Sequence, residues 1–272
     1  MTVGATLRLL RVESGFGLRE FARRLGVSSA YLSRVENGVD ASPTPERLGE
    51  MARALDIPAT VLLDLAHQVS PLVVDYVARV PEAGSLFLEV AHLGLAPDKI
   101  SEIRSWIRRT YGVVSAERWG TPLGVASLLT DERIVLQFQG LGFEDLFDVI
   151  AGRLGAACGM GAARIARVLG EREAEVSSAI GDGVAIPVVH APGPPLAALV
   201  TLAKPLASRT PDGVPLSLMV VLFGTPPDGG FRLQIAEIAR LAARGLARDL
   251  ALLTVPCDVK AHIAKAETRV GE

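Results

Sequence analysis

The chain has 272 residues, of which 49% are hydrophobic, and carries a formal net charge of −2. This length suits two modest domains with substantial cores, and the charge excludes a uniformly basic coat but not a local basic face. Cys158 and Cys257 lie too far apart for a metal-ligand or disulfide spacing. No apolar run approaches the roughly 20 residues that span a bilayer, and early arginines argue against a signal peptide. We therefore expect a soluble cytoplasmic protein with no membrane partner.

The spacing of apolar residues divides the chain into parts with different predicted secondary structure. Residues 1–69 repeat apolar residues at three- and four-residue steps, which is typical of short helices. Residues 70–120 contain proline breaks but look helical between them. From about Ala126 strand-like and helical segments alternate, with helices expected at 143–158, 161–179 and 230–253, which predicts an α/β layer architecture. We predict a multidomain chain: an all-α five-helix domain over 1–69, a helical connector over 70–120, an α/β domain over 121–266 and a tail over 267–272.

Residues 18–38, which read LREFARRLGVSSAYLSRVENG, have the pattern of two short helices joined by a tight corner. Gly26 permits the positive φ that such a corner needs. Ser28 suits the N-cap of the second helix, and the Asn37-Gly38 pair suits its end. Small and apolar residues at this spacing let two helices cross steeply, as a helix-turn-helix requires.

This stretch resembles the lambda-repressor/Cro-like helix-turn-helix regulators, often called the XRE family, whose hallmark runs along the lines of LxxLAxxLGVSxxYLSxIExG. Predicted helices at Thr6–Glu13, Pro45–Leu55 and Pro58–Ala66 complete the five helices of that family. The resemblance implies a bacterial, nucleoid-associated regulator that binds double-stranded operator DNA as a homodimer, without a cofactor. The second helix of the motif would read the major groove. The candidate DNA-binding residues are Arg19, Ser28, Ser29, Tyr31 and Arg34.

Charge within this segment is uneven. Residues 8–34 carry six arginines and two glutamates, a net charge of +4, although residues 1–69 sum to zero. A basic face on a neutral domain is what contact with the DNA backbone requires, but Arg23 and Arg24 can equally be solvated helix residues. Glu36 fits a structural ion pair with an arginine better than a DNA contact, because phosphate repels a carboxylate.

The connector carries aromatic and aliphatic residues at helical spacing. They are Tyr76, Ile100, Ile103, Trp106, Ile107, Tyr111 and Trp119. Two interpretations stay open, namely a connector that packs on its neighbours and an element that dimerises the chain. His67 and His92 stand singly among apolar residues and are interpreted as structural.

The C-terminal part contains the block EREAEVSSAIGDGVAIP at residues 171–187, and the blocks LVTLAKPL and DGVPLSLMVVLFGTP follow it. In this order the blocks resemble an enzyme IIA domain of the mannitol/fructose and nitrogen-regulatory class of the bacterial phosphotransferase system, and the first block is the most telling. The resemblance implies a mixed sheet sandwiched by helices.

In active members the proline is followed by a histidine that accepts a phosphoryl group from a phosphocarrier protein. Here that position is Val188, which has no lone pair, and the second expected histidine is replaced by Phe231 or Arg232. The resemblance therefore implies a degenerate domain without enzymatic phosphotransfer, acting as a sensor or dimerisation module. A cleft at Val188, His190 and Phe231 would receive a small-molecule or protein effector.

Two alternatives stay open for this part. His190 shares a strand face with Val188 and could be a displaced acceptor in a phosphorylation-responsive regulator, although no orienting partner is evident. Alternatively, the chain is an interaction protein that mimics enzyme IIA. No other constellation predicts catalysis or metal binding: Asp182 is expected to stabilise a turn with its side chain, Cys158 to pack, and Asp131 with Glu132 to open a strand or cap a helix.

Overall fold

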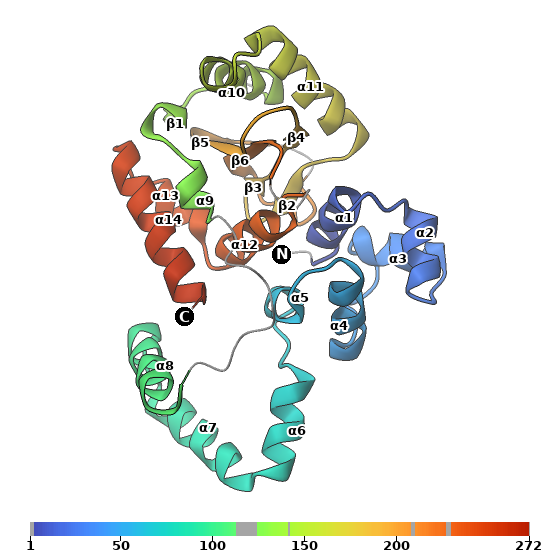
Figure 1. Cartoon of the computed structure of the whole chain (residues 1–272), viewed down its shortest axis with the longest axis vertical. Helices are drawn as coiled ribbons and strands as arrows, with labels where there is room; N and C mark the ends of the chain where they lie inside the picture. Colours follow the sequence, from blue (N-terminus) through green and yellow to red (C-terminus); the bar gives the residue numbers. More distant parts are fainter. Residues whose placement is uncertain (1–2, 113–123, 141, 208–209, 227–229, 272) are drawn as a thin grey trace.

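The computed structural model describes residues 3–112, 124–140, 142–207, 210–226 and 230–271 (Figure 1). Within these ranges the chain forms a helical N-terminal part, an arm of helices that projects away from the rest, and a C-terminal α/β part. The predicted order of an all-α domain, a helical connector and an α/β domain with a mixed sheet is confirmed. No helix in the described ranges is long and apolar enough to cross a membrane.

Helices α1 to α5 make up the N-terminal part: α1 (Val3–Glu13), α2 (Leu18–Arg24), α3 (Ser29–Glu36), α4 (Pro45–Ala54) and α5 (Ala59–Leu65). The corner between α2 and α3 has the predicted chemistry. Gly26 has a φ of +67°, and the Ser28 hydroxyl accepts the Tyr31 backbone N–H at 3.1 Å as the N-cap of α3. Asn37 ends the helix and Gly38 follows with a φ of +68°.

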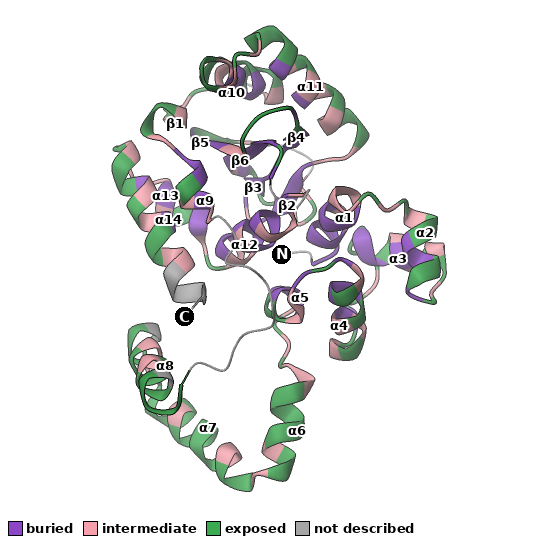
Figure 2. Ribbon diagram, viewed as in Figure 1, coloured by how far each residue is buried: buried purple, intermediate pink, exposed green. Residues whose placement is uncertain are grey.

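The arm consists of α6 (Pro71–Arg79), α7 (Pro81–Leu93) and α8 (Pro97–Tyr111). Each helix starts at a proline, whose fixed φ suits a first turn that needs no N–H donor. The helical prediction for this region is confirmed as far as Tyr111, whereas Trp119 lies outside the described residues. Along α6 and α7 no residue is buried, and Figure 2 shows the arm almost entirely exposed.

The C-terminal part contains a mixed sheet. Its strands are β1 (Ile134–Phe138), β2 (Ala179–Gly181), β3 (Val184–Ala185), β4 (Val188–His190), β5 (Leu196–Leu206) and β6 (Leu216–Gly224). The order is β1-β5-β6-β3-β2, and β4 also pairs with β6. β1 runs parallel to β5, β5 antiparallel to β6, and both β3 and β4 parallel to β6.

The helices of this part are α9 (Val125–Leu128), the one-turn η1 (Asp131–Arg133), α10 (Phe143–Cys158), α11 (Ala162–Glu175), α12 (Arg232–Ala243), α13 (Leu246–Leu250) and α14 (Pro256–Gly271). Two predictions were wrong in detail. The helical segment predicted to reach Ala179 stops at Glu175, because the Glu173 carboxylate accepts the Ser178 N–H at 2.9 Å and the chain turns into β2. The last long helix breaks at Gly245, which has a φ of +92°.

Both faces of the sheet are covered, because successive side chains point to opposite sides. Val189 and Val221 pack beneath α10 and α11 in one apolar cluster. Their neighbours Val188 and Val220 belong to a second cluster on the other face, which α12 and α14 cover. The N-terminal helices share that second cluster, which joins Leu7 and Leu10 of α1 to Ile235 and Ile238 of α12. Helix α1 therefore belongs to both the helical part and the layer behind the sheet.

Candidate nucleic-acid interface

Helices α2 and α3 lie on the side of the molecule that faces away from the sheet (Figure 1). At the start of α3, Ser28 is exposed and Ser29 is half-buried. Tyr31 is half-buried against the core, Arg34 is exposed, and Arg19 is exposed in the first turn of α2. The structure thus places all five predicted DNA-binding residues on the α2–α3 unit, with Tyr31 the least accessible of the aromatic and charged members.

Arg34 has a partner that sequence reasoning missed. Its Nε donates to both carboxylate oxygens of Asp40 at 3.0 Å, and half of the Arg34 side chain stays exposed. Asp40 follows the end of α3 in the loop before α4, and an aspartate six positions after an arginine is no recognised signal for such a pair. The contact orients the guanidinium and reduces the positive charge at this end of α3.

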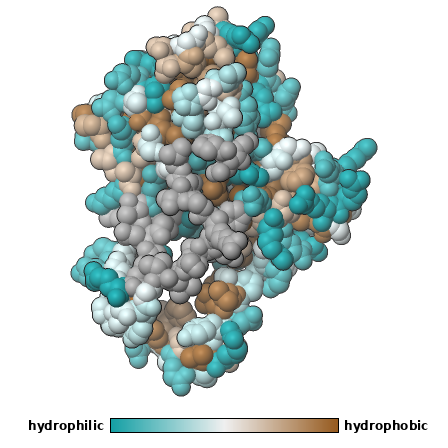
Figure 3. All heavy atoms as spheres, in the orientation of Figure 1, coloured by the Kyte–Doolittle hydropathy of each residue, from teal (hydrophilic) through white to brown (hydrophobic). Residues whose placement is uncertain are grey.

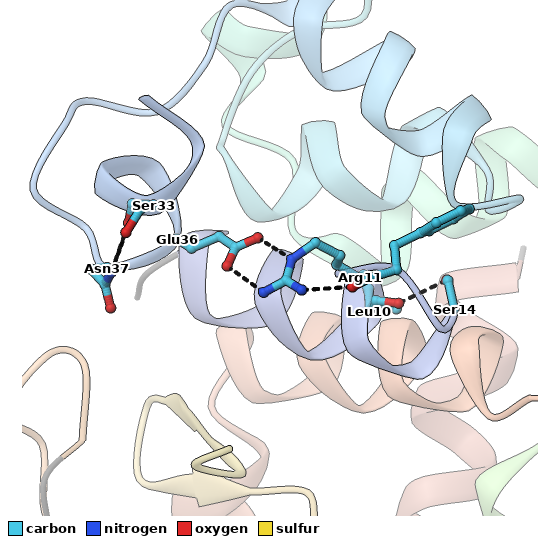
Figure 4. A network of polar contacts seen from close by, with 7 residues as sticks. Leu10, Arg11, Ser14, Ser33, Glu36 and Asn37 are labelled. Carbon is cyan, nitrogen blue, oxygen red and sulfur yellow. Dashed lines mark hydrogen bonds and ion pairs between the residues drawn. The ribbon is translucent and has the colours of Figure 1, made fainter. Parts of the chain in front are cut away.

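Arg11 and Glu36 form a buried ion pair between α1 and the last residue of α3 (Figure 4). The guanidinium Nε and Nη2 donate to the two Glu36 oxygens at 2.6 and 2.8 Å, and Nη1 donates to the Phe16 carbonyl at 2.7 Å. The side chains are only 9% and 3% exposed. This bidentate geometry confirms the interpretation of Glu36 as a structural partner of an arginine.

The basic face is smaller than the sequence predicts. Arg11 lies in the core, and Arg8 is half-buried with its Nη2 donating to the Ser177 carbonyl at 3.5 Å. Exposed arginines remain on α2 and α3, and Arg24 lies over the Phe16 ring at 5.1 Å from its centroid. The predicted charge of +4 over residues 8–34 therefore overstates what reaches the surface, because sequence counts do not distinguish buried from exposed arginines.

The three residues of the predicted ligand cleft come together. Val188 and Phe231 are buried in the same cluster, 4% and 0% exposed. The rings of His190 and Phe231 lie 5.9 Å apart, and the His190 side chain is 45% exposed. His190 ends β4, and Phe231 is the N-cap of α12, so the site lies where a strand end meets a helix N-terminus.

The chain's own Glu13 contacts two of these residues, His190 and Phe231. One Glu13 carboxylate oxygen lies 2.9 Å from His190 Nε2 and accepts the Phe231 backbone N–H at 2.8 Å. The Glu13 side chain is only 1% exposed. The expectation that His190 lacks an orienting partner is therefore wrong. No local pattern could have revealed the contact, because Glu13 and Phe231 are 218 positions apart in the sequence.

Further ion pairs join the N-terminal helices to α12. Arg240 Nη2 lies 2.9 Å from the Asp64 carboxylate of α5, and Arg232 Nη2 lies 3.7 Å from Asp56. Arg240 is the better buried cation, with 16% of its side chain exposed. These contacts surround the apolar packing of α1 and α5 on α12 and fix the helical part against the sheet domain.

The remaining residues singled out in the sequence have structural roles. Asp182 has a φ of +52°, and its turn is held by Asp212, whose carboxylate accepts the Asp182 N–H at 2.7 Å. The prediction that the Asp182 side chain itself stabilises the turn was wrong, since its Oδ2 is buried without a partner, and burial raises the pKa of Asp182. Cys158 is a half-buried free thiol.

Asp131 and Glu132 form the one-turn helix that leads into β1, as predicted. His67 and His92 are both exposed, so neither packs in the core. Among the described residues no cluster of histidine, cysteine, aspartate and glutamate could hold a metal ion.

Comparison with known proteins places the N-terminal part. A family model described as a helix-turn-helix domain matches residues 2–65. The transcriptional regulator SinR of Bacillus subtilis (strain 168) is 32% identical over 66 residues, which are 24% of this chain and 60% of SinR. The transcriptional repressor RghR of the same organism is 36% identical over 78 residues, which are 29% of this chain and 56% of RghR. The chain thus spans less than two thirds of the length of these relatives.

Among solved structures, nitrogen regulatory protein IIA-Ntr from Neisseria meningitidis is similar over 51% of this chain and 98% of that protein, with 23% identity and a TM-score of 0.45. The helix-turn-helix match at residues 2–65 includes α3 and its two caps, Ser28 and Asn37. Residues 2–65, which hold α1 to α5, are therefore similar to a helix-turn-helix domain.

Proposed function

We propose that the protein is a sequence-specific transcriptional regulator that inserts α3 into the major groove of operator DNA. The observation that carries the proposal is that α3 exposes residues at both ends, the N-cap Ser28 and Arg34 in the last turn, while its apolar residues Leu32 and Val35 are buried. An arginine guanidinium can donate two hydrogen bonds to a guanine edge, and small polar residues can contact bases or phosphates. Arg19, at the start of α2, would contact the phosphate backbone.

One such domain reads a half-site, so a regulator of this kind gains affinity and selectivity by pairing. We propose that the arm α6–α8 pairs two copies of the chain. Its large apolar side chains are exposed on helices that have no core of their own, and apolar atoms are visible on it in Figure 3. The exposed members are Leu72, Val73, Val74, Tyr76, Leu86, Phe87, Leu88, Leu93, Ile103, Trp106, Ile107 and Tyr111. Many large apolar side chains exposed on one element are typical of an interface.

Charge favours a second copy as the occupant of the arm. Helices α6 and α7 carry a net charge of −2, from Asp75, Arg79, Glu82 and Glu89. Helix α8 carries a net charge of +2, from Asp98, Lys99, Glu102, Arg104, Arg108 and Arg109. In a two-fold pair each copy would set its α8 against the α6–α7 hairpin of the other, so opposite charges meet twice.

The C-terminal domain, in this proposal, is a sensor or assembly module that does not transfer phosphate at the position where the family has histidine. Val188 holds that position, is 4% exposed and offers no nucleophile. The face of the sheet that carries Val188 instead packs, through α12, against the DNA-binding domain. The C-terminal domain can thereby hold the DNA-binding helices in one orientation.

The proposal is tested by selecting bound duplexes from a random pool with the full chain. Enrichment of a motif with two similar half-sites about one helical turn apart supports a paired helix-turn-helix regulator. Failure to enrich any sequence over a scrambled control contradicts it.

One observation favours a second candidate function, a regulator phosphorylated on His190. A nucleophilic histidine needs a group that orients its ring, and the Glu13 carboxylate lies 2.9 Å from His190 Nε2. The His190 side chain is 45% exposed, so a phosphocarrier can reach it. Incubation with phosphocarrier protein, its upstream enzyme and labelled phosphoenolpyruvate tests this candidate. Stable label that disappears in His190→Ala supports it, and unlabelled wild-type protein excludes it.

A further inference from the structure

Helix α1 contacts both α3 and the predicted ligand cleft of the C-terminal domain. It does so through Arg11 and Glu13, which are only two positions apart. Arg11 binds Glu36, the last residue of α3, with two hydrogen bonds of 2.6 and 2.8 Å. Glu13 binds His190 and the Phe231 N–H at 2.9 and 2.8 Å. Both contacts are buried, since the Arg11 and Glu13 side chains are 9% and 1% exposed.

The contact between α1 and α3 is too close to allow independent movement. A Cβ atom at Gly4 would collide with the Val35 carbonyl oxygen at the end of α3. Leu7 and Leu10 of α1 are fully buried between α3, α5 and α12. Because a close-packed interface transmits displacement rather than absorbing it, a shift of α1 moves α3 with it.

The contact between α1 and the cleft depends on charge. Phe231 caps the N-terminus of α12, where unpaired N–H groups and the helix dipole attract an anion. The Glu13 carboxylate meets that end and the His190 ring together, out of contact with water. Charge-assisted hydrogen bonds of this kind are stronger than neutral ones, and their loss leaves a buried charge unpaired.

We propose that Glu13 is an internal anionic ligand of the C-terminal domain, and that its docking sets the orientation of α3 for operator binding. The proposal rests on the proposed function as a DNA-binding regulator and names how its C-terminal domain acts. Any effector that binds His190 and the α12 N-terminus has to displace Glu13, which frees α1. Such an effector weakens operator binding, because the operator requires the docked orientation. By thermodynamic linkage, operator DNA weakens the binding of that effector by the same factor. Ser28 and Arg34 of the recognition face stay exposed in the docked arrangement, so docking leaves that face accessible to DNA.

The contact itself is tested by hydrogen exchange on the full chain. In Glu13→Ala the Phe231 amide loses its acceptor, and its exchange is expected to accelerate about tenfold, as the loss of a hydrogen bond to a charged group implies. Glu144→Gln is the matched control, because Glu144 is exposed in the first turn of α10. Unchanged exchange at Phe231 in Glu13→Ala overturns the proposal.

The coupling is tested with a duplex selected by the wild-type chain and with a single half-site cut from it. Glu13→Ala and His190→Ala are each expected to weaken binding to the full operator by at least about fivefold, the lower end of typical coupling between sites. The double variant should lose no more than either single one, because the two residues act through one contact. Binding to the half-site should stay within about twofold of wild type, since α3 itself is intact.

The coupling is overturned if the losses of operator affinity in the two single variants add up in the double variant. It is also overturned if operator affinity is unchanged in a variant whose Phe231 amide exchanges faster. Folding failure of one variant does not hide the outcome, because Glu13 and His190 lie in different parts and either one reports. If the wild-type chain selects no duplex, the proposed function fails and the coupling to DNA fails with it, while exchange at Phe231 still decides whether Glu13 docks.

Discussion

The Glu13 carboxylate at the end of α1 lies 2.9 Å from Nε2 of His190 at the end of β4. This contact joins the helix-turn-helix domain to the place where the enzyme IIA resemblance predicts a vacated active site. Val188 is buried there, and Glu13 also accepts the Phe231 N–H. The predicted cleft thereby lies at an interface within the chain.

The Arg11–Glu36 pair is expected to dominate the stability of the N-terminal domain. Arg11→Ala should lower the free energy of unfolding by about 3–5 kcal/mol, because it leaves the Glu36 carboxylate buried and unpaired. Urea unfolding followed by circular dichroism measures the change. Arg34→Ala is the control, since its pair with Asp40 is exposed and should contribute less than about 1 kcal/mol. Equal losses in both variants would contradict the account.

Gly4 is expected to be indispensable for the approach of α1 to α3. Gly4→Ala should destabilise the chain by about 1–3 kcal/mol, because the new methyl group meets the Val35 carbonyl and the backbone has to shift. Gly49→Ala is the matched control within helix α4, where a Cβ meets open space. That substitution should stabilise by about 0.5–1 kcal/mol, as alanine for glycine does inside a helix. Thermal unfolding of both variants decides, and a neutral Gly4→Ala would show that the helices can separate.

The arm is expected to make the chain a dimer. Light scattering on the full chain should give twice the chain mass of 28.7 kDa. Leu86→Asp should shift the protein to the monomer without unfolding it, because Leu86 is 56% exposed and only a partner covers it. Leu252→Asp introduces the same charge at an exposed leucine outside the arm and should leave the dimer intact. A monomeric wild-type chain, or equal effects of the two substitutions, would remove the arm from the proposal.

Glu237 of α12 is expected to reduce stability at neutral and alkaline pH. Burial raises the pKa of Glu237, and its Oε1 has no hydrogen-bond partner. Between the unfolded and the raised folded pKa the folded state holds more protons, so the free energy of unfolding falls as the pH rises through that window and stays lower above it. Glu237→Gln should therefore gain stability relative to wild type at pH 8 and lose that gain near pH 4. Parallel stability profiles of the two proteins would show that the carboxylate is not penalised by burial.

Local sequence signals predict most of the helices and turns of the fold. The corner at Gly26 and the cap at Ser28 follow from steric and hydrogen-bonding rules within one turn of chain, so the sequence predicts them correctly. The same holds for α10, whose observed bounds coincide with the predicted segment. The end of α11 was harder, because it depends on the Glu173 side chain capturing the Ser178 N–H rather than on propensity.

The site depended on contacts between distant segments, which no local pattern encodes. The five DNA-binding candidates could be named because the resemblance to helix-turn-helix regulators implies them, whereas Asp40, which binds Arg34, carried no signal. The sequence also led to the prediction that His190 has no partner. Its partner Glu13 lies in another domain, and only the docking of α1 on α12 brings the two together.

Fluorescence anisotropy with the selected duplex and a scrambled one tests most directly whether α3 reads DNA. Arg34→Ala and Tyr31→Ala should each lose about 1–3 kcal/mol of discrimination between the two duplexes, the range for one good base contact. Arg167→Ala, exposed on α11 and distant from α3, should retain it. Unchanged affinity and selectivity in both α3 variants would contradict the account.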